Sequence, residues 1–189
     1  MRILGISGSL RRGSHNRRLL QAAAAALPPG ADLVEWDGLA GLPAFDEDHE
    51  EAPAEPVRSF LEEIARADAL LIATPEYNAS LPGALKNALD WASRPFSTNP
   101  FRGKPVAVIG ASTGLFGAVW AQAELKKVLA AMGAQIVDSE VVVGQAAEKF
   151  SGGALVHGEH HDQLDEALAA LVAELEPTAP GSARVAAAA

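Results

Sequence analysis

The stretch that decides the fold is RILGISGSLRRGSHN, residues 2–16. A short aliphatic run at residues 2–7 ends in glycine and serine, and an alanine-rich helical pattern begins near Asn16. Short aliphatic runs that end in glycine, proline or serine are typical of strands buried on both faces of a parallel sheet. The stretch therefore predicts a buried strand, a loop and a helix in direct succession.

The same succession recurs along the chain. Further strands are predicted at residues 31–38, 68–75, 104–112 and, less regularly, 135–143. Helical patterns cover residues 16–27, 56–66, 83–92, 119–132 and 162–175. The steady alternation of strand and helix predicts an α/β fold, in which a parallel sheet carries helices on both faces. The acidic segment at residues 45–56 is predicted to be a solvated loop.

Composition limits the kind of protein that this chain can be. Its 189 residues, of which 49% are hydrophobic, predict one domain at residues 1–176, followed by a disordered tail at residues 177–189. The net charge of −9 argues against a nucleic-acid partner. The absence of cysteine excludes disulfides, thiolate metal sites and cysteine nucleophiles. Because no apolar run approaches the roughly 20 residues of a membrane span, we expect a soluble cytoplasmic protein without membrane contact.

Ligands of parallel α/β sheets bind at the carboxyl ends of the strands, where the strand order reverses. The loops after the three most buried predicted strands are therefore the candidate ligand site. The first of these loops leads into the helix near Asn16. A helix N-terminus offers unpaired N–H groups and a partial positive charge, so this loop suits a phosphate.

The first loop favours a monophosphate. From Gly8 its spacing G-x-x-x-x-G-S imitates a nucleoside-triphosphate loop but lacks the lysine, and it contains no G-x-G-x-x-G dinucleotide pattern. Ser9 and Ser14 are expected to donate hydroxyls, Arg11 to pair with the dianion, and Asn16 to cap the helix or donate its amide. The alternative is a capped helix with solvated arginines and no ligand.

The second and third loops suit the rest of a ligand. Tyr77, the one tyrosine of the chain, and Asn78 follow a strand that ends in proline, and an aromatic ring beside an amide suits a flat heterocycle with polar edges. Ser112 and Thr113 in the third loop are able to donate hydrogen bonds. Trp91, on the helix after the second loop, is expected in the core or at a subunit interface.

Two long motifs resemble a known family. GSLRRGSHN, residues 8–16, resembles the phosphate loop G-S-L-R-x-x-S-x-N of the NAD(P)H-dependent FMN reductases, which include quinone and chromate reductases. ATPEYNASLPGALKNALDW, residues 73–91, is similar to the family's P-E-Y-N-x-S-x-P-G-x-L-K-N-x-x-D-W at every specified position, and GQAAEKF, residues 144–150, resembles a late segment. The resemblance implies a flavodoxin-like, three-layer α/β/α sandwich with a five-stranded parallel sheet in the order 2-1-3-4-5.

The resemblance also implies a cofactor and a reaction. FMN would be held without a covalent link, and hydride from NADPH or NADH would pass through it to small acceptors by a ping-pong mechanism. Quinones, flavins, azo compounds and metal oxyanions such as chromate are the acceptors implied. No catalytic side chain and no metal are expected, and the subunits are expected to form homodimers or homotetramers. The implied cofactor-binding residues are Ser9, Leu10, Arg11, Ser14 and Asn16 at the phosphate, Pro75, Glu76, Tyr77 and Asn78 against the ring, and Ser112 and Gly114 on the far side.

One segment departs from the family pattern. Relatives tend to have G-G-x-R-A-Q at residues 117–122, where this chain has Ala118 for the second glycine and Trp120 for the arginine. An arginine at this position would contact a neighbouring subunit or an anionic substrate. The substitution therefore bears on nucleotide preference, acceptor range and subunit contacts.

Two other functions and one metal site are alternatives. A flavodoxin-type electron carrier shares the fold, the cofactor and the acidic charge, but its loops are usually threonine-rich with aromatics on both sides of the ring. An FMN-binding sensor without turnover is favoured by Trp120 alone. His157, His160 and His161 lie close to acidic residues, but adjacent histidines in a glycine-flanked loop rarely converge on one ion, so we expect a solvated loop there. His15 is likewise expected in a surface loop.

Overall fold

The computed structural model describes residues 1–151, 154–156 and 158–176, and the predicted tail at 177–189 lies outside these residues. The strands are β1 (Arg2–Ser7), β2 (Asp32–Trp36), β3 (Ala69–Thr74), β4 (Pro105–Ala111), β5 (Gln135–Ile136), β6 (Val142–Val143), β7 (Phe150–Ser151) and β8 (Ala154–Leu155). The helices are α1 (His15–Ala26), α2 (Glu55–Arg66), α3 (Gly83–Ala92), α4 (Val119–Ala131) and α5 (Glu159–Ala173). Short 3-10 turns lie at η1 (Gly38–Gly41), η2 (Glu47–His49) and η3 (Ala146–Glu148).

The main sheet is parallel and has the order β2-β1-β3-β4-β5, which is the flavodoxin-like order that the resemblance implies. The position after β4 differs from the prediction of one irregular strand at residues 135–143. It is shared by two short strands, since β5 pairs with the start of β4 and β6 pairs with its end. A separate antiparallel pair, β7 and β8, follows.

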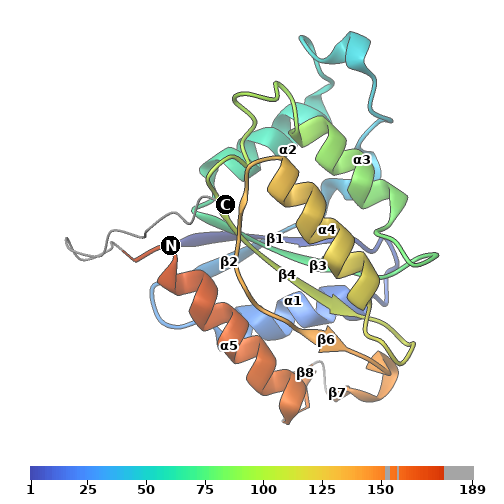
Figure 1. Ribbon diagram of the computed structural model, residues 1–189, viewed down its shortest axis with the longest axis vertical. Coiled ribbons are helices and arrows are strands. Elements are labelled where there is room, and N and C mark those ends of the chain that lie inside the picture. The colour runs from blue at the N-terminus through green and yellow to red at the C-terminus, as the bar shows by residue number, and fades with distance from the viewer. Residues whose placement is uncertain (152–153, 157, 177–189) are drawn as a thin grey trace, which may run out of the picture.

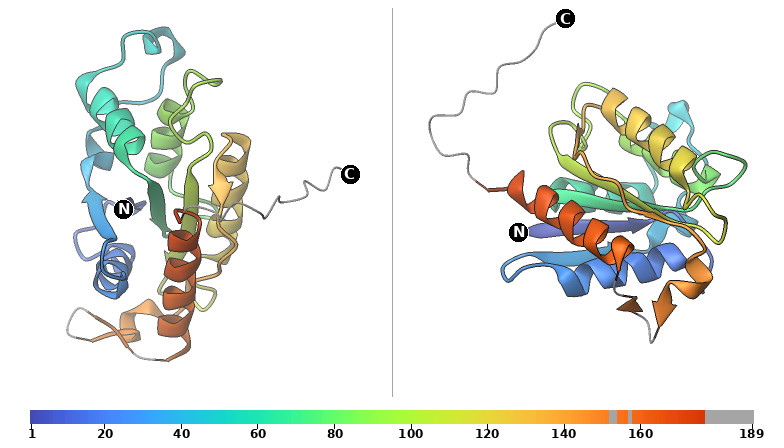
Figure 2. Two further views of the ribbon diagram at one scale, coloured as in Figure 1. Left: turned by 90° about the vertical axis from the view of Figure 1, so that its left-hand side faces the viewer. Right: turned by 60° about the horizontal axis from the view of Figure 1, so that its bottom comes forward.

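Helices cover both faces of the sheet, as Figures 1 and 2 show. Because side chains alternate along a strand, successive residues of β1 enter different cores. Ile3 packs with residues of α1 and α5, whereas Leu4 packs with residues of α2, α3 and α4. All residues of β3 and β4 are buried, so these strands are buried on both faces, as predicted.

Three predicted helix starts are late. Helix α2 begins at Glu55 rather than at residue 56. Helix α1 begins one residue earlier than expected because Ser14 is its N-cap, and the Ser14 Oγ accepts a hydrogen bond of 3.2 Å from the N–H of Arg17. Of the two roles expected for Asn16, capping this helix is therefore wrong, and its amide donates a hydrogen bond instead. Helix α5 begins at Glu159 rather than at residue 162. No helix of the described residues is both long and apolar enough to cross a membrane.

Trp91 belongs to the core of its own chain. Its exposed fraction is 3%, its Nε1 donates to the Pro43 carbonyl at 2.9 Å, and the ring of Phe45 meets it edge-on at 5.0 Å. Trp91 was expected in the core or at a subunit interface, and the core is confirmed. A ring enclosed in this way leaves no surface for a second subunit to contact. The acidic segment that begins at Phe45 is mostly exposed and contains one 3-10 turn.

Candidate functional site

The three predicted loops meet in one pocket at the carboxyl ends of β1, β3 and β4, the edge visible in Figure 1. Its volume is about 130 Å³. The predicted site residues that line it are Ser9, Arg11, Ser14, Asn16, Pro75, Glu76, Tyr77 and Ser112. The other lining residues are His15, Ala111 and Thr113, of which Ala111 and His15 were not expected.

Three predicted site residues do not line this pocket. The Leu10 side chain is 55% exposed beside it. Asn78 lies at the tip of the second loop, where its φ is 54°. Gly114, the third of these residues, lies in the third loop, where its N–H donates to the Ser112 Oγ at 3.1 Å.

The first loop lies against the second because residue 8 is glycine. The N–H of Gly8 donates to the Ala73 carbonyl at 2.8 Å, which continues the pairing of β1 with β3 into the loop. A Cβ at this position would lie 2.9 Å from Leu85 Cδ2 and 3.3 Å from Pro75 Cδ. A larger residue would therefore displace the Leu85 side chain and crowd the Pro75 ring of the second loop.

The serines of the first loop are oriented by their own backbone. The Ser14 Oγ accepts from Arg17, as the N-cap, and the Ser9 Oγ accepts from the N–H of Arg11 at 3.4 Å. A hydroxyl that accepts in this way keeps its proton for another partner. Both serines line the pocket, so both hydroxyl protons are available to an anion there.

Asn16 connects the first loop to the third. Its Nδ2 donates to the Ala111 carbonyl and its Oδ1 accepts from the Ala111 N–H, both at 2.9 Å, and the side chain is buried. The amide thus pairs with the end of β4 as a neighbouring strand would. Since an amide nitrogen carries two N–H groups, the second one can still face a ligand.

The second loop ends in a tight turn that presents Tyr77. Backbone hydrogen bonds join Tyr77 and Ser80 in both directions, at 3.0 and 3.1 Å. Asn78 and Ala79 between them both have positive φ, 54° and 58°, as in the mirror-image turns of β-hairpins. The Tyr77 side chain is 53% exposed at the rim of the pocket, so the face of its ring is open to a flat ligand.

Glu76 has a structural role that its position in the motif does not reveal. Its Oε2 accepts from the N–H groups of Trp120 and Ala121 at 3.1 and 3.2 Å, in the first turn of α4. A carboxylate stabilises a helix at this end, where the partial charge is positive. Sequence reasoning missed the contact, although one signal existed: the N-cap of α4 is Ala118, which has no side-chain oxygen.

The third loop carries an apolar rim. The rings of Phe116 and Trp120 meet edge to face, with centroids 5.1 Å apart and planes at 66°. Their exposed fractions are 58% and 50%, and that of neighbouring Leu115 is 68%. Because a side chain near a helix start leans back over the preceding turn, Trp120 extends from α4 toward the loop that follows β4.

His15 corrects the expectation of a surface loop residue. It is the first residue of α1, is half-buried, and its ring stacks on that of Phe150 with centroids 6.0 Å apart and planes at 22°. Burial lowers the pKa of His15, and the charges of Arg18 and Arg11 lower that pKa further. The sequence missed this residue because the helix start was placed one residue too late.

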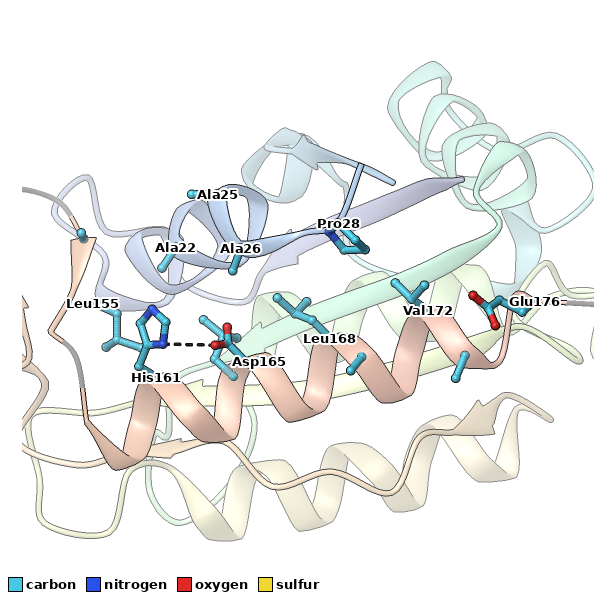
Figure 3. A pocket seen from close by; sticks show the side chains of 14 residues that line it. Ala22, Ala25, Ala26, Pro28, Leu155, His161, Asp165, Leu168, Val172 and Glu176 are labelled. Carbon is cyan, nitrogen blue, oxygen red and sulfur yellow. Dashed lines mark ion pairs between the residues drawn. The ribbon is translucent and has the colours of Figure 1, made fainter. Parts of the chain in front are cut away.

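A larger cavity of about 690 Å³ lies elsewhere, between α1 and α5 (Figure 3). Alanines of α1 face Leu168 and Val172 of α5 across it, and the polar groups include an ion pair between His161 and Asp165 at 3.3 Å. The cavity runs along the helices rather than at the strand ends, and its lining is mainly apolar. It therefore does not suit a phosphate.

The histidines before and within α5 do not form a metal cluster in the part of the chain that the structure describes. His160 Nδ1 lies 3.4 Å from Gln163 Oε1, and His161 pairs with Asp165. His157 lies outside the described residues. Within those residues no group of three or more histidine, aspartate or glutamate side chains is arranged to hold a metal ion.

Comparison with known proteins gives consistent matches. The family of NADPH-dependent FMN reductases matches residues 1–148. An NAD(P)H-dependent FMN reductase of Pseudomonas aeruginosa is 43% identical over 174 residues, which cover 90% of this chain and 93% of that protein. A 2-hydroxy-1,4-benzoquinone reductase of a Burkholderia species is 46% identical over 130 residues, or 69% of this chain and 70% of that protein. The structure of FerB, a flavoenzyme NAD(P)H:(acceptor) oxidoreductase of Paracoccus denitrificans, matches with a TM-score of 0.83 and 33% identity, covering 92% of this chain and 96% of FerB.

Proposed function

This chain belongs to the NADPH-dependent FMN reductase family, and from that premise we propose that it is a cytoplasmic reductase that transfers hydride from NAD(P)H to quinones at the pocket between its three loops. Its fold is flavodoxin-like, it is an oxidoreductase, and its cofactor is FMN. Flavins, azo compounds and metal oxyanions such as chromate belong to the same proposal as further acceptors.

The observation that carries the proposal is the convergence of the three loops. The pocket begins at the N-terminus of α1, and Ser9, Ser14 and Arg11 line it there. Two hydroxyl donors, a guanidinium and the positive end of a helix suit a phosphate monoester. A pocket of about 130 Å³ suits the phosphate end of FMN, while the flat ring would extend outward against Tyr77.

The chain supplies binding and orientation to this reaction. FMN, when bound, supplies the hydride-accepting and hydride-donating chemistry. Tyr77 offers an exposed ring face at the rim, and Glu76 holds the second loop to the start of α4. Because nucleotide and acceptor would use the same open rim, we propose that they bind in turn, which is a ping-pong cycle. No side chain is assigned a proton-transfer role.

The proposal includes a homodimer or homotetramer. What supports it is the exposed apolar rim of Leu115, Phe116 and Trp120 beside the site, since exposed apolar patches often mark interfaces. Trp91 contributes nothing to such an interface because it is buried within its own chain. Analytical ultracentrifugation of the FMN-loaded protein tests the assembly, and a monomer at micromolar concentration would exclude it.

The decisive experiment follows the flavin absorbance. The FMN-loaded protein is mixed anaerobically with NADPH, then with NADH, in a stopped-flow instrument, and a quinone is added afterwards. Rapid bleaching of the flavin band and its recovery with the quinone are expected, and the two rates rank the donors. Binding of FMN without reduction by either nucleotide would favour the electron carrier or the sensor.

A matched pair of variants tests the phosphate site. Arg11→Ala removes a guanidinium that lines the pocket, whereas Arg12→Ala removes the same charge from the neighbouring exposed residue, which does not line it. Arg11→Ala is expected to weaken FMN binding about tenfold or more, and Arg12→Ala much less. Equal effects of the two variants on the FMN dissociation constant would exclude the assigned role of Arg11.

A further inference from the structure

His15 lines the pocket and has no role in the function described so far. Its ring is held by stacking on Phe150, and its Nδ1 is buried without a hydrogen-bond partner among the described residues. Nδ1 is enclosed and out of reach of a ligand, whereas Nε2 is not enclosed and forms no hydrogen bond among the described residues. Nε2 is therefore the nitrogen of this imidazole that a ligand in the pocket can meet.

The charges around His15 oppose its protonation while the pocket holds no anion. Arg11 from the first loop and Arg18 from α1 lower its pKa, as does burial. The positive end of α1, where His15 is the first residue, acts in the same direction. Phe150 of β7 contributes an uncharged face, and the Glu76 carboxylate in the same pocket is engaged by α4. The imidazole is therefore mainly neutral at pH 7.

We propose that His15 is a phosphate-binding residue that takes up a proton when FMN binds, so that the cofactor is bound as its phosphate dianion together with an imidazolium. The inference rests on the proposed placement of the FMN phosphate at the first loop. The proton comes from the solvent, and the imidazole nitrogen that receives it becomes a charged donor.

Proton uptake is expected because the phosphate dianion changes the electrostatic potential at His15 from positive to negative. A dianion within about 4–6 Å of an imidazole favours the charged form of the ring and typically raises its pKa by 1–3 units. The same dianion also neutralises the two arginines, so their repulsion no longer prevents protonation. The affinity for FMN should then rise as the pH falls from 8 to about 6.5. Below about pH 6 the phosphate itself becomes protonated, and the trend should level off.

Calorimetry measures the proton directly. FMN is titrated into the apo form of the full chain at pH 7 in buffers of different ionisation enthalpy, and the slope of the binding enthalpy gives the protons taken up. The control variant is His15→Phe, which keeps an aromatic ring to stack on Phe150 but has no nitrogen. We expect net uptake by the unmodified protein and none by His15→Phe, whose affinity at pH 6.5 should be about tenfold lower.

Riboflavin provides the matched ligand, since it lacks the phosphate. Its binding should take up no proton and should be equally strong in the unmodified protein and in His15→Phe. His15→Asn, which keeps a hydrogen-bonding nitrogen that cannot be protonated, is a second variant should His15→Phe fold poorly. It should likewise bind FMN without proton uptake.

The outcomes separate this inference from the function on which it rests. Equal proton uptake and equal pH dependence in the unmodified protein and the variants would overturn the role of His15, while loss of FMN affinity in Arg11→Ala would leave the phosphate site standing. If Arg11→Ala has no effect on FMN binding, the phosphate site itself is wrong, and His15 has no phosphate to bind.

Discussion

Asn16 and Ala111, 95 positions apart in the chain, form two hydrogen bonds of 2.9 Å that join the first turn of α1 to the last residue of β4. The pair is buried and lies beneath the pocket that both residues line. The first and third loops therefore keep a constant separation, which a ligand touching both of them requires.

Asn16→Ala should lower the free energy of unfolding by about 3 kcal/mol, because it leaves the N–H and C=O of Ala111 buried without partners. Equilibrium unfolding in urea measures the loss. Asn87→Ala is the matched control, since Asn87 also bonds to two backbone groups, the Phe45 N–H and the Pro43 carbonyl, but at a partly exposed site. Its cost should be about 1 kcal/mol, and equal costs for the two variants would contradict the prediction.

Glu76→Ala should destabilise the protein by about 1–2 kcal/mol because it removes the acceptor for the N–H groups of Trp120 and Ala121 at the start of α4. Glu76→Gln keeps an oxygen acceptor without the charge and should cost about half as much. Thermal unfolding of both variants measures the difference. A Gln variant less stable than the Ala variant would show that the carboxylate does not act as a helix cap.

Ala118→Gly should be neutral or should stabilise the protein by up to about 1 kcal/mol. Ala118 has a φ of 67°, a left-handed conformation that costs alanine about 1–2 kcal/mol, and glycine relieves this strain at some entropic cost. Ala123→Gly, on the exposed face of α4, is the control and should cost about 1 kcal/mol. Urea unfolding that ranks the two variants equally would refute the strain at Ala118.

Trp120→Arg should change the preference among acceptors. It replaces half of the Phe116–Trp120 ring pair at the rim with a positive charge. The ratio of kcat/KM for an anionic acceptor such as chromate to that for an uncharged quinone should rise about tenfold, from a lost ring contact and a gained charge. Steady-state assays with both acceptors measure this ratio, with ultracentrifugation to detect any change in assembly.

Phe96→Arg is the control for Trp120→Arg. Phe96 is 57% exposed but precedes β4, so it lies at the other end of the sheet from the pocket. It adds the same charge and should leave the ratio unchanged. If both variants shift the ratio alike, net charge rather than the rim governs acceptor choice.

Acid should remove the contribution of Glu63 to stability. A hydrogen bond from Arg2 is the main cause that lowers the pKa of Glu63 below its ordinary value of 4.5, burial opposes it, and Arg66 adds to the lowering. A lowered pKa in the folded state means that the contribution is present above pH 4.5 and is lost as the pH falls through the folded-state pKa. Relative to Glu63→Gln, the unmodified protein should be about 1 kcal/mol more stable at pH 6, and this advantage should shrink as the pH falls below 4.5.

Urea unfolding at a series of pH values measures this advantage. Glu62→Gln is the control, because Glu62 pairs with Arg66 at an exposed site and should contribute about 0.3–0.5 kcal/mol. An advantage over Glu63→Gln that does not shrink as the pH falls below 4.5 would mean that ionisation of Glu63 is not its source.

Much of the architecture was predictable because it depends on local patterns. Fully aliphatic runs such as β3 and β4 are compatible only with burial on both faces, and they specify a parallel sheet covered by helices. Helix α1, in contrast, was placed one residue late, because Ser14 and Asn16 are both good cap residues in sequence. Only the geometry of the turn distinguishes them. That single shift also hid His15, which lines the pocket from the first helical position.

The sequence by itself determined the α/β fold, the edge of the sheet at which the loops gather, and most of the residues that line the pocket, because strand ends and glycine-rich loops are encoded within a few neighbouring positions. Tertiary structure alone decided what those residues do for one another. Asn16 holds Ala111, Glu76 caps a helix 44 positions away, and Phe150 stacks on His15. Such partners come together only when the helices pack on the sheet, so no local pattern of residues encodes them.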